Sequence, residues 1–154
     1  KSLVGRPGFP QLRYCGFESR TKVLVMGLLG PSLEHLRVAC GGSLSFKTVL
    51  MLGDQLVDRL DVLHSEGYVH RDIAPQNVLL GRGKDEGVVH LIDYGLCKRF
   101  KDPETQKHIE YRDGKLIKGT MWFASLNALR GRELSRRDDL EAVGYVLLYL
   151  LRGS

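Results

Sequence analysis

The sequence has few cysteines and lacks a long apolar run, and each shortage argues against a class of protein. The three cysteines, Cys15, Cys40 and Cys97, are widely spaced and include no Cys-x-x-Cys pair, which argues against a disulfide framework or a zinc site. A membrane-spanning helix needs about eighteen or more consecutive apolar residues, and the sequence contains no such run. We therefore expect reduced thiols and a cytoplasmic or nuclear protein.

A dense basic stripe is also absent from the sequence. The chain carries 23 Lys and Arg against 18 Asp and Glu, but these basic residues are spread out apart from small clusters at 98–101 and 136–137. Because nucleic-acid-binding surfaces need a denser patch, we expect no direct binding to nucleic acid, and nothing indicates binding to membranes. The hydrophobic fraction of 43% and the charged fraction of 27% are typical of a soluble globular domain.

Apolar patterns in the sequence predict an α+β arrangement of short strands and three helices. The expected strands cover residues 11–17, 21–29, 78–80 and 88–92, and the expected helices begin at Ser32, Ser45 and Ser135. The second helix has a serine N-cap, an apolar face and a closing glycine, Gly67. The third begins with a capping box and is apolar almost all round, which predicts burial inside a larger domain.

Two polar motifs follow these elements closely. Residues 70–77 read His-Arg-Asp-Ile-Ala-Pro-Gln-Asn, so that Asn77 follows Asp72 by five positions, and Asp93 begins an Asp-Tyr-Gly sequence after an apolar run. Taken singly, the first motif could be two turn residues and the second a hairpin turn. Taken together they supply a base and hard oxygen ligands, as phosphoryl transfer with Mg²⁺ requires.

The order of these motifs resembles the signature of eukaryotic protein kinases, and the chain is more closely similar to the casein kinase I family. That similarity extends over essentially the whole chain, and it is carried by residues 25–33, 108–112, 119–127 and 135–147. The resemblance implies a partial protein-kinase-like fold, in which residues 1–29 hold two strands and the hinge at the end of the N-lobe. Residues 30–154 would be the first part of a mainly helical C-lobe.

The resemblance also implies the roles of single residues. Asp72 would orient the substrate hydroxyl and accept its proton, while Asn77 and Asp93 would hold Mg²⁺ against the phosphates of ATP. Asp139 would bond the backbone of the 70–77 loop, although it could also be an ordinary acid in the first turn of a helix. We expect His70 to be a packed loop histidine without a catalytic role.

Five further residues would form the nucleotide site if the resemblance holds. Met26 would lie behind the adenine as the gatekeeper, and the backbone of Leu28 and Leu29 would hydrogen-bond the adenine edge. Leu79 and Ile92 would pack under and beside the base. The implied activity is transfer of the γ-phosphate of ATP to Ser or Thr hydroxyls of protein substrates, whereas the oligomeric state is not indicated.

Three departures from the family pattern affect this interpretation. Ala74 stands where Ser/Thr kinases carry a Lys, and Gln76 does not supply the Arg with which tyrosine kinases compensate; losing such a cation lowers transition-state stabilisation by about a few kcal/mol. Trp122 replaces an Arg of the family's anion site, although Lys115 remains at a matching position, so the preference for acidic substrates does not carry over.

The glycine-rich loop and its partner Lys are missing, and residues 1–8 contain neither an initiating Met nor the apolar core of a signal peptide. We therefore expect a segment of a longer kinase.

Two other functions remain open. A pseudokinase or scaffold module is favoured by Ala74 and Gln76 and opposed by the intact acids and Asn77. A small-molecule phosphotransferase shares His-x-Asp-x-x-x-x-Asn, but Arg71, Gly95 and the 135–141 segment argue against it.

Overall fold

The computed structural model describes residues 3–154; Lys1 and Ser2, at the start of the segment expected to lack a signal peptide, lie outside the described residues. The strands are β1 (Leu12–Glu18), β2 (Thr21–Met26), β3 (Tyr68–Val69), β4 (Val78–Leu80), β5 (Val89–Leu91) and β6 (Lys98–Arg99). The α-helices are α1 (Leu33–Ala39), α2 (Phe46–Ser65), α3 (Leu126–Leu129) and α4 (Arg136–Arg152). Short 3₁₀ turns include η1 (Pro75–Asn77), η2 (Gly83–Asp85), η3 (Tyr94–Leu96) and η4 (Met121–Phe123). The predicted α+β arrangement is confirmed.

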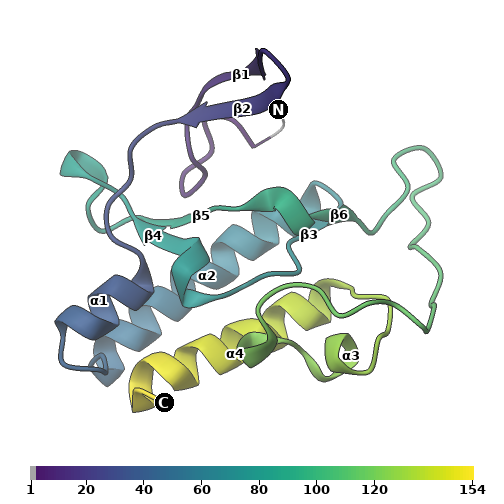
Figure 1. The fold of residues 1–154 in the computed structure, drawn as a ribbon. Coiled ribbons are helices and arrows are strands. Elements are labelled where there is room, and N and C mark those ends of the chain that lie inside the picture. The colour runs from purple at the N-terminus through teal and green to yellow at the C-terminus, as the bar shows by residue number, and fades with distance from the viewer. Residues whose placement is uncertain (1–2) are drawn as a thin grey trace.

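The strands pair as three antiparallel two-stranded sheets within the described residues, β1 with β2, β3 with β6, and β4 with β5. Figure 1 shows the β1–β2 hairpin standing apart from the helical part, with β4 and β5 lying over α2 and α4 running beside α2. The prediction of a strand over 21–29 was too long, because β2 ends at Met26. Gly30 then donates its amide to the carbonyl of Leu80, which draws the connecting chain away from the hairpin and onto β4.

Helix α2 forms the centre of the core. Its N-cap is Ser45, whose hydroxyl accepts the Thr48 amide, and Gly67 follows its end in a left-handed conformation, as predicted. The residues it buries recur at helical spacing and are Val49, Leu52, Gly53, Leu56, Leu60 and Leu63. Full burial of one leucine such as Leu56 contributes about 1.5–3 kcal/mol. Gly53 permits the close approach of α4, since a Cβ there would lie 2.8 Å from a methyl of Leu147.

Helix α4 begins with the predicted capping box, in which Asp138 accepts the Ser135 amide at 2.7 Å. Only one face of this helix is buried, through Ala142, Val143, Val146 and Leu150. Leu140, Tyr145 and Leu148 are exposed, so the apolar character all round the helix does not translate into burial all round it. None of the helices within residues 3–154 has the length and apolar content needed to cross a bilayer.

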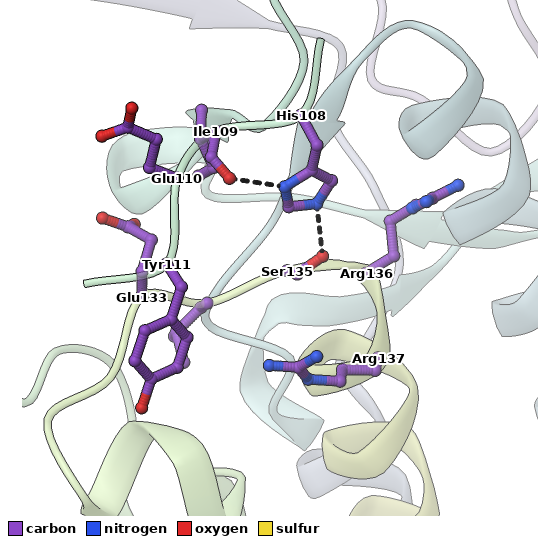
Figure 2. A pocket seen from close by; sticks show the side chains of 9 residues that line it. His108, Ile109, Glu110, Tyr111, Glu133, Ser135, Arg136 and Arg137 are labelled. Carbon is purple, nitrogen blue, oxygen red and sulfur yellow. Dashed lines mark hydrogen bonds between the residues drawn. The ribbon is translucent and has the colours of Figure 1, made fainter. Parts of the chain in front are cut away.

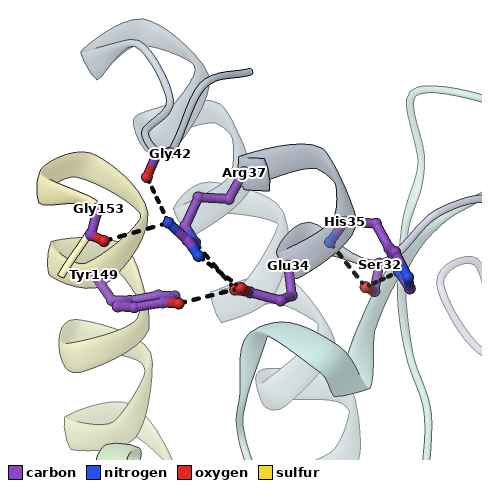
Figure 3. A network of polar contacts seen from close by, with 7 residues as sticks. All are labelled: Ser32, Glu34, His35, Arg37, Gly42, Tyr149 and Gly153. Atoms are coloured by element: carbon purple, nitrogen blue, oxygen red, sulfur yellow. Dashed lines mark hydrogen bonds and ion pairs between the residues drawn. The ribbon is translucent and has the colours of Figure 1, made fainter. Parts of the chain in front are cut away.

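A polar cluster joins α1 to the end of α4, as Figure 3 shows. The guanidinium of Arg37 binds both carboxylate oxygens of Glu34 and also donates to the carbonyls of Gly42 and Gly153. It lies 4.7 Å from the ring centroid of Tyr149, whose hydroxyl donates to Glu34. The hydrogen bond from Arg37 lowers the pKa of the Glu34 carboxyl, so the cluster holds its charges at neutral pH and ties the two helices together.

Candidate active site

The loop at 70–77 is anchored from below by Asp139 of α4. This carboxylate is 2% exposed; one oxygen accepts the His70 amide and the His64 ring N–H, each at 2.8 Å, and the other accepts the Arg71 amide at 2.8 Å. Arg71 has a φ of 70°, which a non-glycine residue adopts only where its surroundings enforce it. The predicted bond between Asp139 and the loop is confirmed, and it fixes the backbone directly before Asp72.

Both carboxylate oxygens of Asp72 are held by neighbours on different segments. The Asn77 side-chain amide donates to one of them at 2.9 Å and to the Asp72 carbonyl at 3.0 Å. The other oxygen accepts the amide and the hydroxyl of Thr120, at 2.7 and 2.8 Å. The nitrogen of Asn77 is therefore committed to Asp72, which leaves its amide oxygen, the end that binds hard cations, facing away from that bond.

Residues 119 and 120 lie so close to the 70–77 loop that position 119 has no room for a side chain. Gly119 has a φ of 85°, and a Cβ there would lie 2.7 Å from the Arg71 carbonyl oxygen and 3.1 Å from an oxygen of Asp72. The side chain of Gln76 donates to the Thr120 hydroxyl at 3.1 Å. Sequence reasoning missed the part played by Thr120, because 48 positions separate it from Asp72 and no local pattern links them.

Asp93 stands at the end of β5 in a strained conformation. Its φ of 62° is left-handed, and its carboxylate accepts the Gly95 amide at 3.1 Å. The Ile92 amide donates to the Asn77 carbonyl at 3.0 Å, so the two motifs of the sequence meet at this point. An exposed carboxylate and an amide oxygen are a donor set that suits Mg²⁺, whereas no group of three or more His, Cys, Asp or Glu side chains in the described part of the chain could hold a metal ion alone.

His70 and Tyr94 support the Asp93 segment from inside. The His70 ring is fully buried and donates to the Ile92 carbonyl at 3.0 Å, and its other nitrogen accepts the Asp72 amide at 3.3 Å. Burial lowers the pKa of His70, so the ring is neutral and packed, as predicted. The hydroxyl of the half-buried Tyr94 donates to the Leu91 carbonyl at 2.8 Å, and partial burial raises the pKa of this hydroxyl.

An open cleft of about 800 Å³ lies between the β1–β2 hairpin and the Asp93 segment. Three of the predicted site residues, Met26, Ile92 and Asp93, line it. Its other lining is mainly apolar, with Leu3, Val4, Phe9, Pro10, Leu12, Leu24, Leu63, Tyr68, Tyr94, Gly95 and Cys97. Burial raises the pKa of the Cys97 thiol to about 11, so this group is uncharged.

The remaining predicted nucleotide residues lie outside the lining of this cleft. Leu28 is 79% exposed and Leu29 half-buried in the connection that follows β2. Their backbone amides make no hydrogen bond within residues 3–154. These amides can therefore donate to an acceptor outside the chain. Leu79 is half-buried on β4, where it forms a bridge with Ser32.

A basic recess of about 480 Å³ lies behind the loop, lined by Arg71, Lys98, Lys115, Lys118 and Arg132 among others. The buried Glu133 pairs there with Lys98 at 2.6 Å and with Lys115 at 3.4 Å. Burial would raise the pKa of Glu133, but the hydrogen bond and charge of Lys98 outweigh it and lower that pKa. The Lys98 pair ties β6, and the Lys115 pair ties the segment at 112–115, to the chain that enters α4.

A second recess, of about 430 Å³, lies beside the start of α4 and is seen in Figure 2. The His108 ring donates to the Ile109 carbonyl at 2.7 Å and accepts the Ser135 hydroxyl at 2.9 Å. Arg136 on the same rim lies over the Phe100 ring, 4.9 Å from its centroid. These contacts fold the long irregular segment after Asp93 back onto α4.

The family model described as the protein kinase domain matches residues 13–154, nearly the whole chain and all of the residues around Asp72, Asn77 and Asp93.

Proposed function

The chain belongs to the protein kinase family, and from that premise we propose that it is an ATP- and Mg²⁺-dependent protein serine/threonine kinase of the casein kinase I type. Its mixed α+β fold is consistent with a partial protein kinase, and protein kinases act on protein substrates. The observation that carries the proposal is the arrangement of Asp72, which is held by Asn77 and Thr120 beside the segment that carries Asp93.

In the proposed reaction Asp72 orients the substrate hydroxyl and accepts its proton as the phosphoryl group is transferred. Its support is geometric: one oxygen is held by Asn77 and the other by Thr120, so the carboxylate cannot rotate freely. A base fixed in this way loses little entropy when the substrate binds. The anchor at Asp139 holds the loop that carries it.

Asn77 and Asp93 would hold Mg²⁺, through the amide oxygen of the first and the carboxylate of the second. When bound, the metal ion neutralises charge on the ATP phosphates. Asp93 has a left-handed backbone, and its carboxylate accepts the Gly95 amide. The bond between the Ile92 amide and the Asn77 carbonyl keeps the two ligands close together, Asn77 directly before β4 and Asp93 shortly after β5.

The nucleotide base would enter the cleft beside Met26 and Ile92. The amides of Leu28 and Leu29 would bond its polar edge, which is consistent with their making no hydrogen bond within residues 3–154. Leu79 would pack under the base. We propose the same division as the sequence suggests, with residues 1–29 ending the N-lobe and residues 30–154 beginning the C-lobe.

A pseudokinase is the second candidate, and Ala74 favours it. This residue is fully buried, and it stands at the position where, by the resemblance to Ser/Thr kinases, a Lys would meet the transferring phosphoryl. The cysteines, all free thiols, support the proposed cytoplasmic or nuclear location for either function.

The test is an ATP/Mg²⁺ phosphotransfer assay of the full reading frame on a casein-type protein substrate. We expect Asp93→Ala to abolish transfer and Asp72→Asn to lower kcat by about 10²–10⁴-fold, the range for loss of a general base. Phosphate should appear on Ser or Thr. Turnover no better than that of Asp93→Ala would refute the enzyme and favour the pseudokinase.

A further inference from the structure

We propose that Gln76 is a positioning residue for phosphoryl transfer, and that it acts on Asp72 through the hydroxyl of Thr120. Gln76 keeps one carboxylate oxygen of Asp72 occupied, so that the other oxygen is selected as the acceptor of the substrate's proton. This inference rests on the proposed kinase function and adds a residue to its machinery. Residue type alone did not suggest such a role, because Gln76 carries no charge and is exposed.

The side chains of Gln76, Thr120 and Asp72 form a chain of hydrogen bonds with a fixed direction. The Nε2 atom of Gln76 lies 3.1 Å from the Oγ1 atom of Thr120, which lies 2.8 Å from Oδ1 of Asp72. An ionised carboxylate can only accept, so the single proton of the Thr120 hydroxyl is committed to Asp72. The hydroxyl oxygen must then accept its second hydrogen bond, and the amide N–H of Gln76 supplies it. Hydrogen bonds linked in this way strengthen one another.

The two carboxylate oxygens of Asp72 are held by different numbers of donors. Oδ1 accepts both the amide and the hydroxyl of Thr120, whereas Oδ2 accepts the side-chain amide of Asn77 at 2.9 Å. Each carboxylate oxygen has about two lone-pair sites, so Oδ1 is fully occupied and Oδ2 keeps one site for the substrate. The proton of the substrate hydroxyl passes to Oδ2, while the substrate oxygen bonds the γ-phosphorus and the bond from that phosphorus to ADP breaks.

The loop offers no replacement for the hydrogen bond that Gln76 donates. Residues 73–77 read Ile-Ala-Pro-Gln-Asn, so Gln76 and Asn77 carry the only side-chain N–H groups of this stretch. Both belong to the 3₁₀ turn η1. One turn therefore serves both sides of the carboxylate, because Asn77 bonds one oxygen directly and Gln76 supports the other through Thr120.

The exposure of Gln76 allows its effect on the rate to be separated from an effect on folding. Pro75 and Asn77 on either side are buried, but Gln76 is exposed, and replacing an exposed side chain changes stability little. Asp72 takes the substrate's proton only in the transition state. We therefore expect loss of the Gln76 bond to lower kcat and kcat/KM together, with KM for ATP and for the peptide unchanged.

The first experiment is a double-mutant cycle on the full reading frame, with kcat for transfer to a serine peptide as the readout. Gln76→Ala should lower kcat by about 3- to 10-fold, as expected for the loss of one hydrogen bond. The same change should have no effect in Thr120→Val, which lacks the hydroxyl but keeps the shape of the side chain. An equal loss in both backgrounds would show that Gln76 acts without Thr120 and would overturn the proposal, as would a fall in urea stability that accounts for the loss of rate.

Gln76→Glu tests the direction of the hydrogen bonds separately from the shape of the side chain. A glutamate has nearly the shape of glutamine but can only accept, so it competes with Asp72 for the Thr120 proton. We expect kcat to fall by about 10- to 100-fold, more than in Gln76→Ala, because the competing acceptor is charged. Gln106→Glu makes the same charge change at an exposed glutamine that donates to carbonyls of its own turn, and should leave kcat unchanged. A Gln76→Glu variant no slower than Gln76→Ala would overturn the proposal.

Hydrogen exchange at the Thr120 amide measures the same contact without an activity assay. This amide donates to Asp72 at 2.7 Å, and its exchange should be about 3- to 10-fold faster in Gln76→Ala and faster still in Gln76→Glu. The His70 amide, which bonds Asp139, should exchange at the wild-type rate in both variants. Unchanged exchange at Thr120 would overturn the proposal alone. No transfer by wild type would refute the kinase function, and with altered exchange it would reduce Gln76 to a structural support.

Discussion

Asp139→Ala tests whether one buried carboxylate holds the 70–77 loop in place. The side chain accepts three hydrogen bonds at 2.8 Å, two of them from the backbone amides of His70 and Arg71. Leaving each of those amides unpaired costs about 1–3 kcal/mol, and the His64 ring loses its hydrogen-bond partner as well. We therefore expect the free energy of unfolding to fall by about 3–5 kcal/mol, a large part of the stability of an ordinary domain.

The measurement is urea unfolding of the full reading frame, paired with kcat at a temperature where every variant is folded. Asp138→Ala is the matched control, because Asp138 is equally buried but bonds Ser125, Asn127 and the Ser135 amide, none of which belongs to the loop. Both variants should lose stability, but only Asp139→Ala should also lower kcat by tenfold or more. A loss below about 1 kcal/mol for Asp139→Ala, or an equal fall of kcat in both variants, would refute this account of the anchor.

Three further perturbations test other contacts of the site. Because Ala74 is fully buried, Ala74→Lys and Ala74→Met are compared only after urea unfolding shows both to be folded. Ala74→Lys should then raise kcat by tenfold or more by restoring the missing cation, whereas the uncharged Ala74→Met should not; an unchanged rate in folded Ala74→Lys would mean that another group supplies that charge. Gly114→Ala, left-handed but with open space around it, should lower the free energy of unfolding by about 1–2 kcal/mol for its backbone alone and leave kcat unchanged. Gly119→Ala should lose more stability, because its Cβ also meets the Arg71 carbonyl, and should lower kcat as well. Because burial lowers the pKa of His70 from 6.5, its contribution to stability is complete above pH 6.5 and is lost as the pH falls below it, by up to about 1.4 kcal/mol per pH unit. A His70→Asn variant whose Tm falls as steeply as that of wild type between pH 7 and 5 would contradict this.

Three of the four α-helices in the described part of the chain were predictable because their signals are local, whereas the four-residue α3 was not predicted. Ser45, Ser135 and Gly67 mark helix ends through the chemistry of one turn, and the apolar period of α2 identifies its buried face. The pairing of β3 with β6 was not predicted, since two-residue strands carry no period and the paired residues lie 29 and 31 positions apart. Which face of α4 is buried was not predicted, because composition does not say which elements pack against a helix.

The residues of the candidate site also differ in how far the sequence could predict them. Asp72, Asn77 and Asp93 could be singled out from residue type and spacing, whereas the bond between Asp139 and the loop was expected only from a family resemblance. The contact of Thr120 with Asp72 depends on how the irregular segment after Asp93 returns to the loop. That return is set by the fit of Gly119 against the Arg71 carbonyl, a steric condition that exists only in the folded chain.

The hydrogen bonds that hold the 70–77 loop do not depend on the residue at position 74. Asp72 is fixed by Asn77, by Thr120 and, through the backbone, by Asp139, and none of these bonds involves the side chain of Ala74. Gln76 supports the same arrangement by donating to Thr120. The departure at Ala74 therefore removes a positive charge without loosening the proposed base. Its effect should fall on the rate of phosphoryl transfer and leave folding and substrate positioning intact, so kcat is the quantity that distinguishes a slow kinase from a scaffold.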